Sequence, residues 1–99
     1  MGNIELYTLA KDYEARGNID MYLKTLQEMV ARDQMFSPGQ LELGQFFLRT
    51  GDIMNAKKKL IDYLNAYQTG LTIGMIEWAK QQIQEIDKKL NPQAPAPAK

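Results

Sequence analysis

One pattern of ten residues occurs twice in the chain, and the two copies start 34 residues apart. Residues 9–18 (LAKDYEARGN) and residues 43–52 (LGQFFLRTGD) share an apolar residue before a small one, then an aromatic residue, then glycine and a side chain that can cap a helix. A fixed period of roughly 20–50 residues is typical of stacked supersecondary units, and helix–turn–helix repeats are one kind. The period therefore predicts a scaffold made of two similar units.

Apolar residues recur every three or four positions along most of the chain, which places them on one face of successive helices. The predicted helices span residues 3–16, 19–33, 38–50, 53–67 and 72–90. No segment shows the alternating pattern of a strand, so the fold class is predicted to be all-α with five helices. Residues 91–99, rich in proline and alanine, have nothing to bury and are expected to form a disordered tail.

Polar residues and glycines mark the expected ends of these helices. A side-chain oxygen before the first turn can accept from a free backbone N–H, and glycine can adopt the left-handed conformation after the last turn. Gly17 and Gly51 are the expected C-terminal glycines, and Pro38 suits the first turn of the third helix. The expected N-terminal caps are Asn3, Asn18, Ser37 (in a capping box with Gln40) and Asp52.

The composition argues against several classes of function. Twelve basic and twelve acidic residues give a formal net charge of zero, so nothing in the total favours a nucleic-acid partner. The chain has no cysteine and no histidine, which removes the commonest general base and metal ligands. No spacing singles out a pair of carboxylates among residues such as Glu14 and Glu42. We therefore expect no enzymatic activity, no cofactor and no metal site.

No apolar run is long enough to span a bilayer, and the N-terminus lacks the layout of a signal peptide. We expect no membrane insertion; the compartment stays open, with the cytoplasm favoured. The run Lys57-Lys58-Lys59 is interpreted as a solvated outer face in preference to a phosphate-binding patch.

The paired segments resemble the tetratricopeptide repeat family. The residues that carry the resemblance in the second unit are Leu43, Gly44, Phe47, Ala56 and Leu60, and those in the first are Leu9, Ala10, Tyr13, Tyr22 and Leu26. Tyr22 departs from the family by replacing a small residue, and Leu6 and Gln40 stand where Trp or Tyr is expected. The resemblance implies a right-handed stack of antiparallel hairpins over residues 3–33 and 38–67, closed by a capping helix over 72–90, as one domain spanning 1–90.

Such a stack would carry a concave groove lined by the first helix of each unit. The expected groove residues are Tyr7, Lys11, Glu14, Leu41, Gln45, Leu48, Arg49 and Gln81. Leu41 and Leu48 are interpreted either as an apolar strip for a partner side chain or as scattered surface leucines, and the choice stays open. Trp78 is interpreted as covering the fourth helix in preference to anchoring a ligand.

The resemblance implies a non-enzymatic protein–protein interaction module that binds a peptide or helix of a partner protein. The alternative is a structural role, as a terminal fragment of a longer array or as a self-associating scaffold. RNA binding, known for related helical repeats, is disfavoured by the neutral charge.

Overall fold

The computed structural model of the protein describes residues 1–91, and the expected Pro/Ala tail from residue 92 onward lies outside the described residues. Helices account for most of this part of the chain, which contains no β-strand, so the all-α prediction with five helices is confirmed. The helices are α1 (Asn3–Ala15), α2 (Ile19–Arg32), α3 (Ser37–Thr50), α4 (Ile53–Asn65) and α5 (Ile76–Leu90), the last preceded by a 3-10 turn, η1 (Ile73–Met75).

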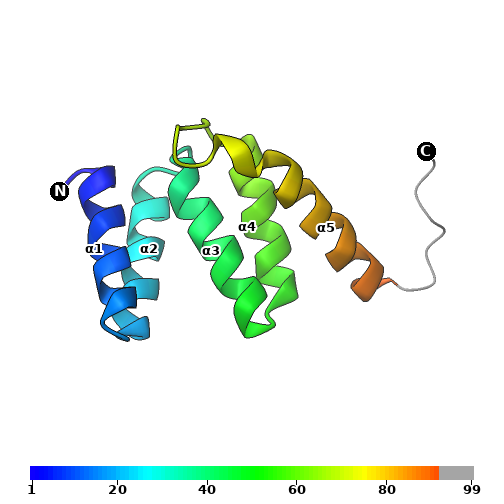
Figure 1. Cartoon of the computed structure of the whole chain (residues 1–99), viewed down its shortest axis with the longest axis horizontal. Helices are drawn as coiled ribbons and strands as arrows, with labels where there is room; N and C mark the ends of the chain where they lie inside the picture. Colours follow the sequence, from blue (N-terminus) through cyan, green and yellow to red (C-terminus); the bar gives the residue numbers. More distant parts are fainter. Residues whose placement is uncertain (92–99) are drawn as a thin grey trace.

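The helices pack as neighbours in chain order (Figure 1). α1 and α2 lie side by side and run in opposite directions, and α3 and α4 do the same. α2 contacts α3 and α4 contacts α5, which gives an elongated molecule of 46 × 26 × 20 Å. The first helices of the two pairs, α1 and α3, are held together mainly by the side chains described below.

The same turn joins α1 to α2 and α3 to α4, as the repeated pattern predicts. Gly17 and Gly51 have φ angles of 78° and 83°, values that other residues rarely adopt. The side chain of Asn18 then accepts from the backbone N–H of Met21 at 3.2 Å, and Asp52 accepts from Asn55 N–H at 3.3 Å. The caps predicted at Asn18 and Asp52 are therefore confirmed.

The caps predicted at Asn3 and Ser37 are wrong, because both side chains bond to distant segments instead. Asn3 lies inside α1 and donates to the Asp33 carboxylate at 2.9 Å, which ties the start of α1 to the end of α2. Ser37 lies inside α3, and its hydroxyl pairs with that of Thr72 at 2.8 Å. Long-range hydrogen bonds, part-buried at Asn3 and buried at Ser37, have taken the place of local ones.

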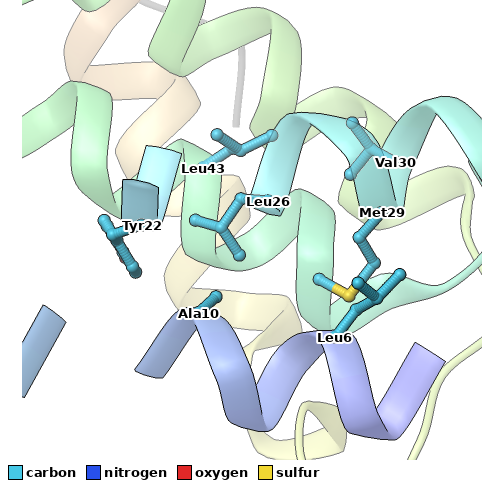
Figure 2. Close-up of a cluster of buried hydrophobic side chains, with 7 residues drawn as sticks. All are labelled: Leu6, Ala10, Tyr22, Leu26, Met29, Val30 and Leu43. Carbon is cyan, nitrogen blue, oxygen red and sulfur yellow. The ribbon is translucent and has the colours of Figure 1, made fainter. Parts of the chain in front are cut away.

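Two apolar cores stabilise the molecule. The first fills the space between α1, α2 and α3 (Figure 2) and contains Leu6, Ala10, Tyr22, Leu26, Met29, Val30 and Leu43. The second lies between α3, α4 and α5 and contains Leu41, Ala56, Leu60, Tyr63, Ala79 and Ile86. The helix α3 contributes to both cores, so it is the central element of the fold.

Close packing of α3 against α4 depends on Gly44. A Cβ atom at this position would lie 2.8 Å from the Cδ2 atom of Leu60, a fully buried side chain. The resemblance predicts that Gly44 faces Ala56, but the atoms nearest to Gly44 belong to Leu60. Gly44 is nevertheless a site of close approach between the two helices.

The segment between α4 and α5 is longer than predicted, because α4 ends at Asn65 and α5 begins only at Ile76. Thr72, expected to start the fifth helix, is instead a buried anchor. Its carbonyl accepts from the Tyr63 hydroxyl, and its own hydroxyl meets Ser37. Trp78 is half-buried and packs against the second core, which includes Ala56, Leu60 and Tyr63 of α4.

Candidate functional site

The two leucines of the expected groove pack inside the protein. Leu41 is only 6% exposed and belongs to the second core with Ala79 and Ile86 of α5, and Leu48 packs partly against the same core. Both interpretations of Leu41, as part of an apolar strip for a partner and as a scattered surface leucine, are therefore wrong. Leu41 is buried in the second core, and Leu48 is half-buried beside it, so the two do not form a free apolar strip.

The polar residues of the expected groove are brought together between α1 and α3. Tyr7, Lys11 and Glu14 are spaced by three or four residues, so they share one face of α1. We define the polar seam as these three residues with Tyr22 of α2 and Glu42 and Arg49 of α3. It joins three helices through side-chain hydrogen bonds and ion pairs.

Glu42 is the centre of the polar seam, and its side chain is only 10% exposed. One carboxylate oxygen accepts from the Tyr22 hydroxyl at 2.7 Å, and the other accepts from Lys11 Nζ at 3.2 Å. The Tyr7 hydroxyl adds a longer contact at 3.4 Å. A buried carboxylate without partners costs several kcal/mol, so these donors are what allows Glu42 to occupy this position.

A second set of ion pairs extends the polar seam along α1. Lys11 also lies 2.8 Å from Glu14, and Glu14 in turn lies 3.3 Å from Arg49 at the end of α3. The Arg49 guanidinium stands 5.9 Å from the ring centre of Phe46. Lys11 and Arg49 are about half exposed, so this part of the polar seam faces solvent.

The pKa values of the polar seam follow from burial and from these contacts. Burial raises the pKa of Tyr22, and the hydrogen bond to Glu42 raises it further. Burial, then the charge of Glu42, also raises the pKa of Tyr7. Burial alone would lower the pKa of Lys11, but its bonds to Glu14 and Glu42 outweigh this and raise it. The bond to Lys11 lowers the pKa of Glu14 in spite of its partial burial.

The charges of the polar seam balance internally, because two cations face two carboxylates. Lys11 connects the two carboxylates, and Arg49 holds the outer one. The arrangement fixes the side chains in place and leaves hydrogen-bonding groups of Lys11, Glu14 and Arg49 partly open to solvent. It is suited to contacting polar groups of a partner without a large excess of either charge.

Two expected groove residues stay apart from the polar seam. Gln45 is half-buried on α3, and Gln81 is exposed on α5. Within residues 1–91, no hydrogen bond joins either side chain to the polar seam. Sequence reasoning also missed the roles of Tyr22 and Glu42. Tyr22 could have been noticed because it stands where the resemblance expects a small residue. A tyrosine that is buried there needs a polar partner for its hydroxyl.

The three consecutive lysines of α4 have separate surroundings. Lys57 forms an ion pair with Asp87 of α5, and Lys59 lies 3.7 Å from Asp62. Lys58 and Lys59 border a shallow hollow of about 320 Å³, whose other lining residues are Val30, Ala31, Gln34, Gln40 and Asp62. Among residues 1–91 the buried Oε1 atom of Gln40 has no hydrogen-bond partner, while its Nε2 donates to the Gln34 carbonyl.

Within the described residues, no helix combines the length and apolar character needed to cross a membrane. Residues 1–91 also contain no group of three or more acidic, histidine or cysteine side chains placed to hold a metal ion. No protein-family model matches the chain, and comparison with curated proteins and with solved structures gives no significant match.

Proposed function

We propose that the chain is a non-enzymatic, tetratricopeptide-like interaction module that binds a peptide or a helix of a partner protein. The binding surface is the face formed by α1 and α3 around the solvent-facing part of the polar seam. In this proposal the hairpins α1–α2 and α3–α4 are two stacked repeats, and α5 closes the array. The supporting observation is the ion-paired contact of α1 with α3 through Lys11, Glu14 and Arg49.

The burial of the polar seam supports a preformed surface. Lys11 donates to Glu42, which is itself held by the Tyr22 hydroxyl. The exposed side chains are therefore already ordered before a partner binds. A surface whose side chains are already ordered loses less conformational entropy when a partner binds. Tyr7 is half-buried and its hydroxyl contacts Glu42, and Gln45 is half-buried on α3, four residues before Arg49.

The charge distribution favours a protein partner over RNA. Affinity for a nucleic acid rests on cations that are free to neutralise phosphates. On the α1–α3 face, Lys11 and Arg49 are already paired with carboxylates of the same chain. A peptide with its own mixture of donors, acceptors and apolar groups fits such a surface better than a polyanion does.

Selection from a phage-displayed random peptide library, followed by calorimetry on the selected peptides, tests this proposal. We expect Gln45→Ala and Arg49→Ala to weaken binding of the selected peptides about tenfold, which corresponds to roughly 1.4 kcal/mol. Both substitutions remove exposed or half-exposed side chains, so the fold should persist. Lys24→Ala is the matched control, because Lys24 is exposed on α2 away from the polar seam.

The proposal fails if no peptide is selected, or if the selected peptides bind both variants as tightly as they bind the unmodified chain. Loss of binding in the Lys24→Ala control would also contradict it, since the contact surface would then include α2. Circular dichroism of each variant separates loss of binding from loss of structure.

A further inference from the structure

The hollow bordered by Lys58 and Lys59 is lined by α2, α3, α4 and the α2–α3 connection, and we call it the lysine hollow. Its volume of about 320 Å³ lies at the lower end of the range of roughly 300–1,000 Å³ found for small-molecule sites. A water molecule takes up about 30 Å³, so the hollow exceeds what a single water or ion needs. The lysine hollow can therefore hold a small organic molecule.

The most buried residue of the lysine hollow carries a side-chain amide. Gln40 is 2% exposed, and its Nε2 atom donates to the Gln34 carbonyl at 3.1 Å. A carbonyl oxygen only accepts, so this bond places the amide nitrogen toward Gln34 and identifies the other atom as the oxygen. Among the buried side-chain nitrogen and oxygen atoms of residues 1–91, Oε1 of Gln40 alone has no hydrogen-bond partner. A ligand in the hollow can satisfy this atom only with a hydrogen-bond donor.

Packing does not require a polar residue at this position. The residue 34 positions earlier is Leu6, which is 3% exposed and belongs to the first core. In the first unit a leucine is therefore buried at the same position without leaving an acceptor unpaired. A buried amide oxygen without a partner has lost its hydration and gained no bond in return. The amide of Gln40 is better explained by a ligand than by the stability of the free chain.

The more exposed part of the lysine hollow has one positive charge in excess. Two lysines and one aspartate line it, and Lys59 Nζ lies 3.7 Å from the Asp62 carboxylate. Within residues 1–91, Lys58 forms no ion pair. Its side chain is exposed and flexible, so the ammonium group can turn toward a bound anion. Val30 and Ala31 add an apolar wall on the side of α2.

We propose that the lysine hollow binds a small hydroxylated carboxylate, such as a sugar acid. The carboxylate pairs with Lys58, and a hydroxyl group donates to Oε1 of Gln40. The carbon chain between these two groups lies against the apolar wall. A hydroxyl can donate and accept at the same time, so further hydroxyls suit the neighbouring Lys59 and Asp62.

Other classes of ligand fit the lysine hollow less well. An anion that carries only acceptors, such as a fatty acid, leaves the buried Oε1 atom of Gln40 unpaired. An uncharged polyol leaves Lys58 without a counter-charge, and an anion of higher charge is repelled by Asp62. A metal cation is repelled by the two ammonium groups. No residue of this lining belongs to the polar seam, so the site is independent of the proposed peptide-binding face.

Titration of the full chain with three compounds of equal chain length tests the proposal. Gluconate carries a carboxylate and hydroxyls, hexanoate carries the carboxylate without hydroxyls, and sorbitol carries hydroxyls without the carboxylate. We expect gluconate to bind about tenfold more tightly than either of the other two, and to shift the side-chain amide signal of Gln40 in heteronuclear NMR spectra. The proposal is overturned if gluconate does not bind, binds no more tightly than hexanoate or sorbitol, or leaves the Gln40 signal unmoved.

Two substitutions each remove one of the proposed polar contacts. Gln40→Leu should weaken gluconate binding about tenfold, to the level of hexanoate, and Lys58→Gln should weaken it to the level of sorbitol. Lys58 is exposed, so its variant should keep the fold. Lys89→Gln is the matched control, because Lys89 is exposed on α5 and does not line the hollow. Unchanged affinity in Gln40→Leu or in Lys58→Gln, or an equal loss in Lys89→Gln, overturns the proposal.

Thermal unfolding without ligand separates a binding role of Gln40 from a structural one. If the amide serves a ligand, Gln40→Leu should unfold at the same or a higher temperature than the unmodified chain, because an apolar side chain replaces an unpaired acceptor. If the amide serves only to hold the Gln34 carbonyl, Gln40→Leu should unfold at a lower temperature and bind gluconate as tightly as before. The second result would overturn the proposal.

Discussion

The contacts that α3 makes with α1 and with the second core differ in chemistry. Toward α1 it presents Glu42 and Arg49 to the polar seam, whereas toward α5 it presents Leu41 and Leu48 to the second core. Positions 34 residues apart show that polar side chains of α1 are replaced by leucines in α3. Tyr7 corresponds to Leu41, and Glu14 corresponds to Leu48.

The comparison shows that one helix, α3, can pack on one side through polar side chains and on the other through apolar ones. Fully burying a leucine contributes about 1.5–3 kcal/mol, with no requirement on direction. A hydrogen bond to a charged group contributes a similar amount only when the geometry is satisfied, and the cost of desolvation must be overcome first. The contact with α5 therefore contributes mainly stability, whereas the polar seam also fixes how α1 and α3 are aligned.

The largest effect is expected from breaking the apolar contact. Leu41→Ala should lower the free energy of unfolding by about 2–5 kcal/mol, because it leaves a cavity in the second core. Urea denaturation measures this change. Met54→Ala, at an exposed position, should change stability by less than about 0.5 kcal/mol. Equal costs for the two variants would show that Leu41 is not buried in the second core.

A smaller effect is expected from the buried half of the polar seam. Tyr22→Phe keeps the ring but removes the hydroxyl that donates to Glu42, which should cost about 1.5–3 kcal/mol. Tyr13→Phe is the matched control, because Tyr13 is half-buried and, among residues 1–91, its hydroxyl makes no hydrogen bond. If chemical denaturation gives the same loss for both, Glu42 does not depend on Tyr22.

Alkaline pH should weaken the polar seam and also the second core, where burial raises the pKa of Tyr63. Because the pKa of Tyr22 is raised on folding, the unfolded chain loses this proton first, at the ordinary tyrosine pKa of about 10. Stability is therefore complete below about pH 10 and falls above it, by up to about 1.4 kcal/mol per pH unit from this group. The raised pKa values of Tyr7 and Lys11 act in the same direction. Stability measured against pH should fall less steeply in Tyr22→Phe, and parallel curves would exclude this linkage.

The smallest effect is expected at the solvent-facing end of the polar seam. Arg49→Ala should cost no more than about 1 kcal/mol, because the Arg49 side chain is 54% exposed and its ion pair with Glu14 is screened by water. High salt should reduce the difference between Arg49→Ala and the unmodified chain. A large, salt-independent loss would mean that packing on Phe46 outweighs the ion pair.

Local features of this fold could be predicted from the sequence, because they depend on neighbouring residues. The glycine turns at Gly17 and Gly51 and the caps at Asn18 and Asp52 are set by residues within one helical turn of each other. Ser37 could not be predicted in this way, because its hydroxyl bonds to Thr72, which lies 35 residues further along the chain.

The candidate site was harder to predict than the helices, because it depends on how α5 and α1 are placed against α3. The seven-residue spacing of Leu41 and Leu48 does indicate a stripe that needs a cover, but the sequence does not say which element supplies it. For Glu42 no periodic signal exists, because its closest donor, Tyr22, lies on another helix. The repeat predicted that Lys11, Glu14 and Arg49 lie on the same surface. Only the structure shows that Glu14 forms ion pairs with both Lys11 and Arg49.

The twin glycine turns also bear on the order of folding. Each turn joins two helices that pack side by side, so much of the structure forms between residues close in sequence, and such proteins fold quickly. The bonds to Glu42 join residues 20 and 35 positions apart, across separate hairpins. We therefore expect the Glu42 carboxylate to be desolvated late in folding, after both helical hairpins have formed. Tyr22→Phe should then speed unfolding and leave the refolding rate nearly unchanged in stopped-flow experiments, and slowed refolding would place the polar seam in the folding nucleus instead.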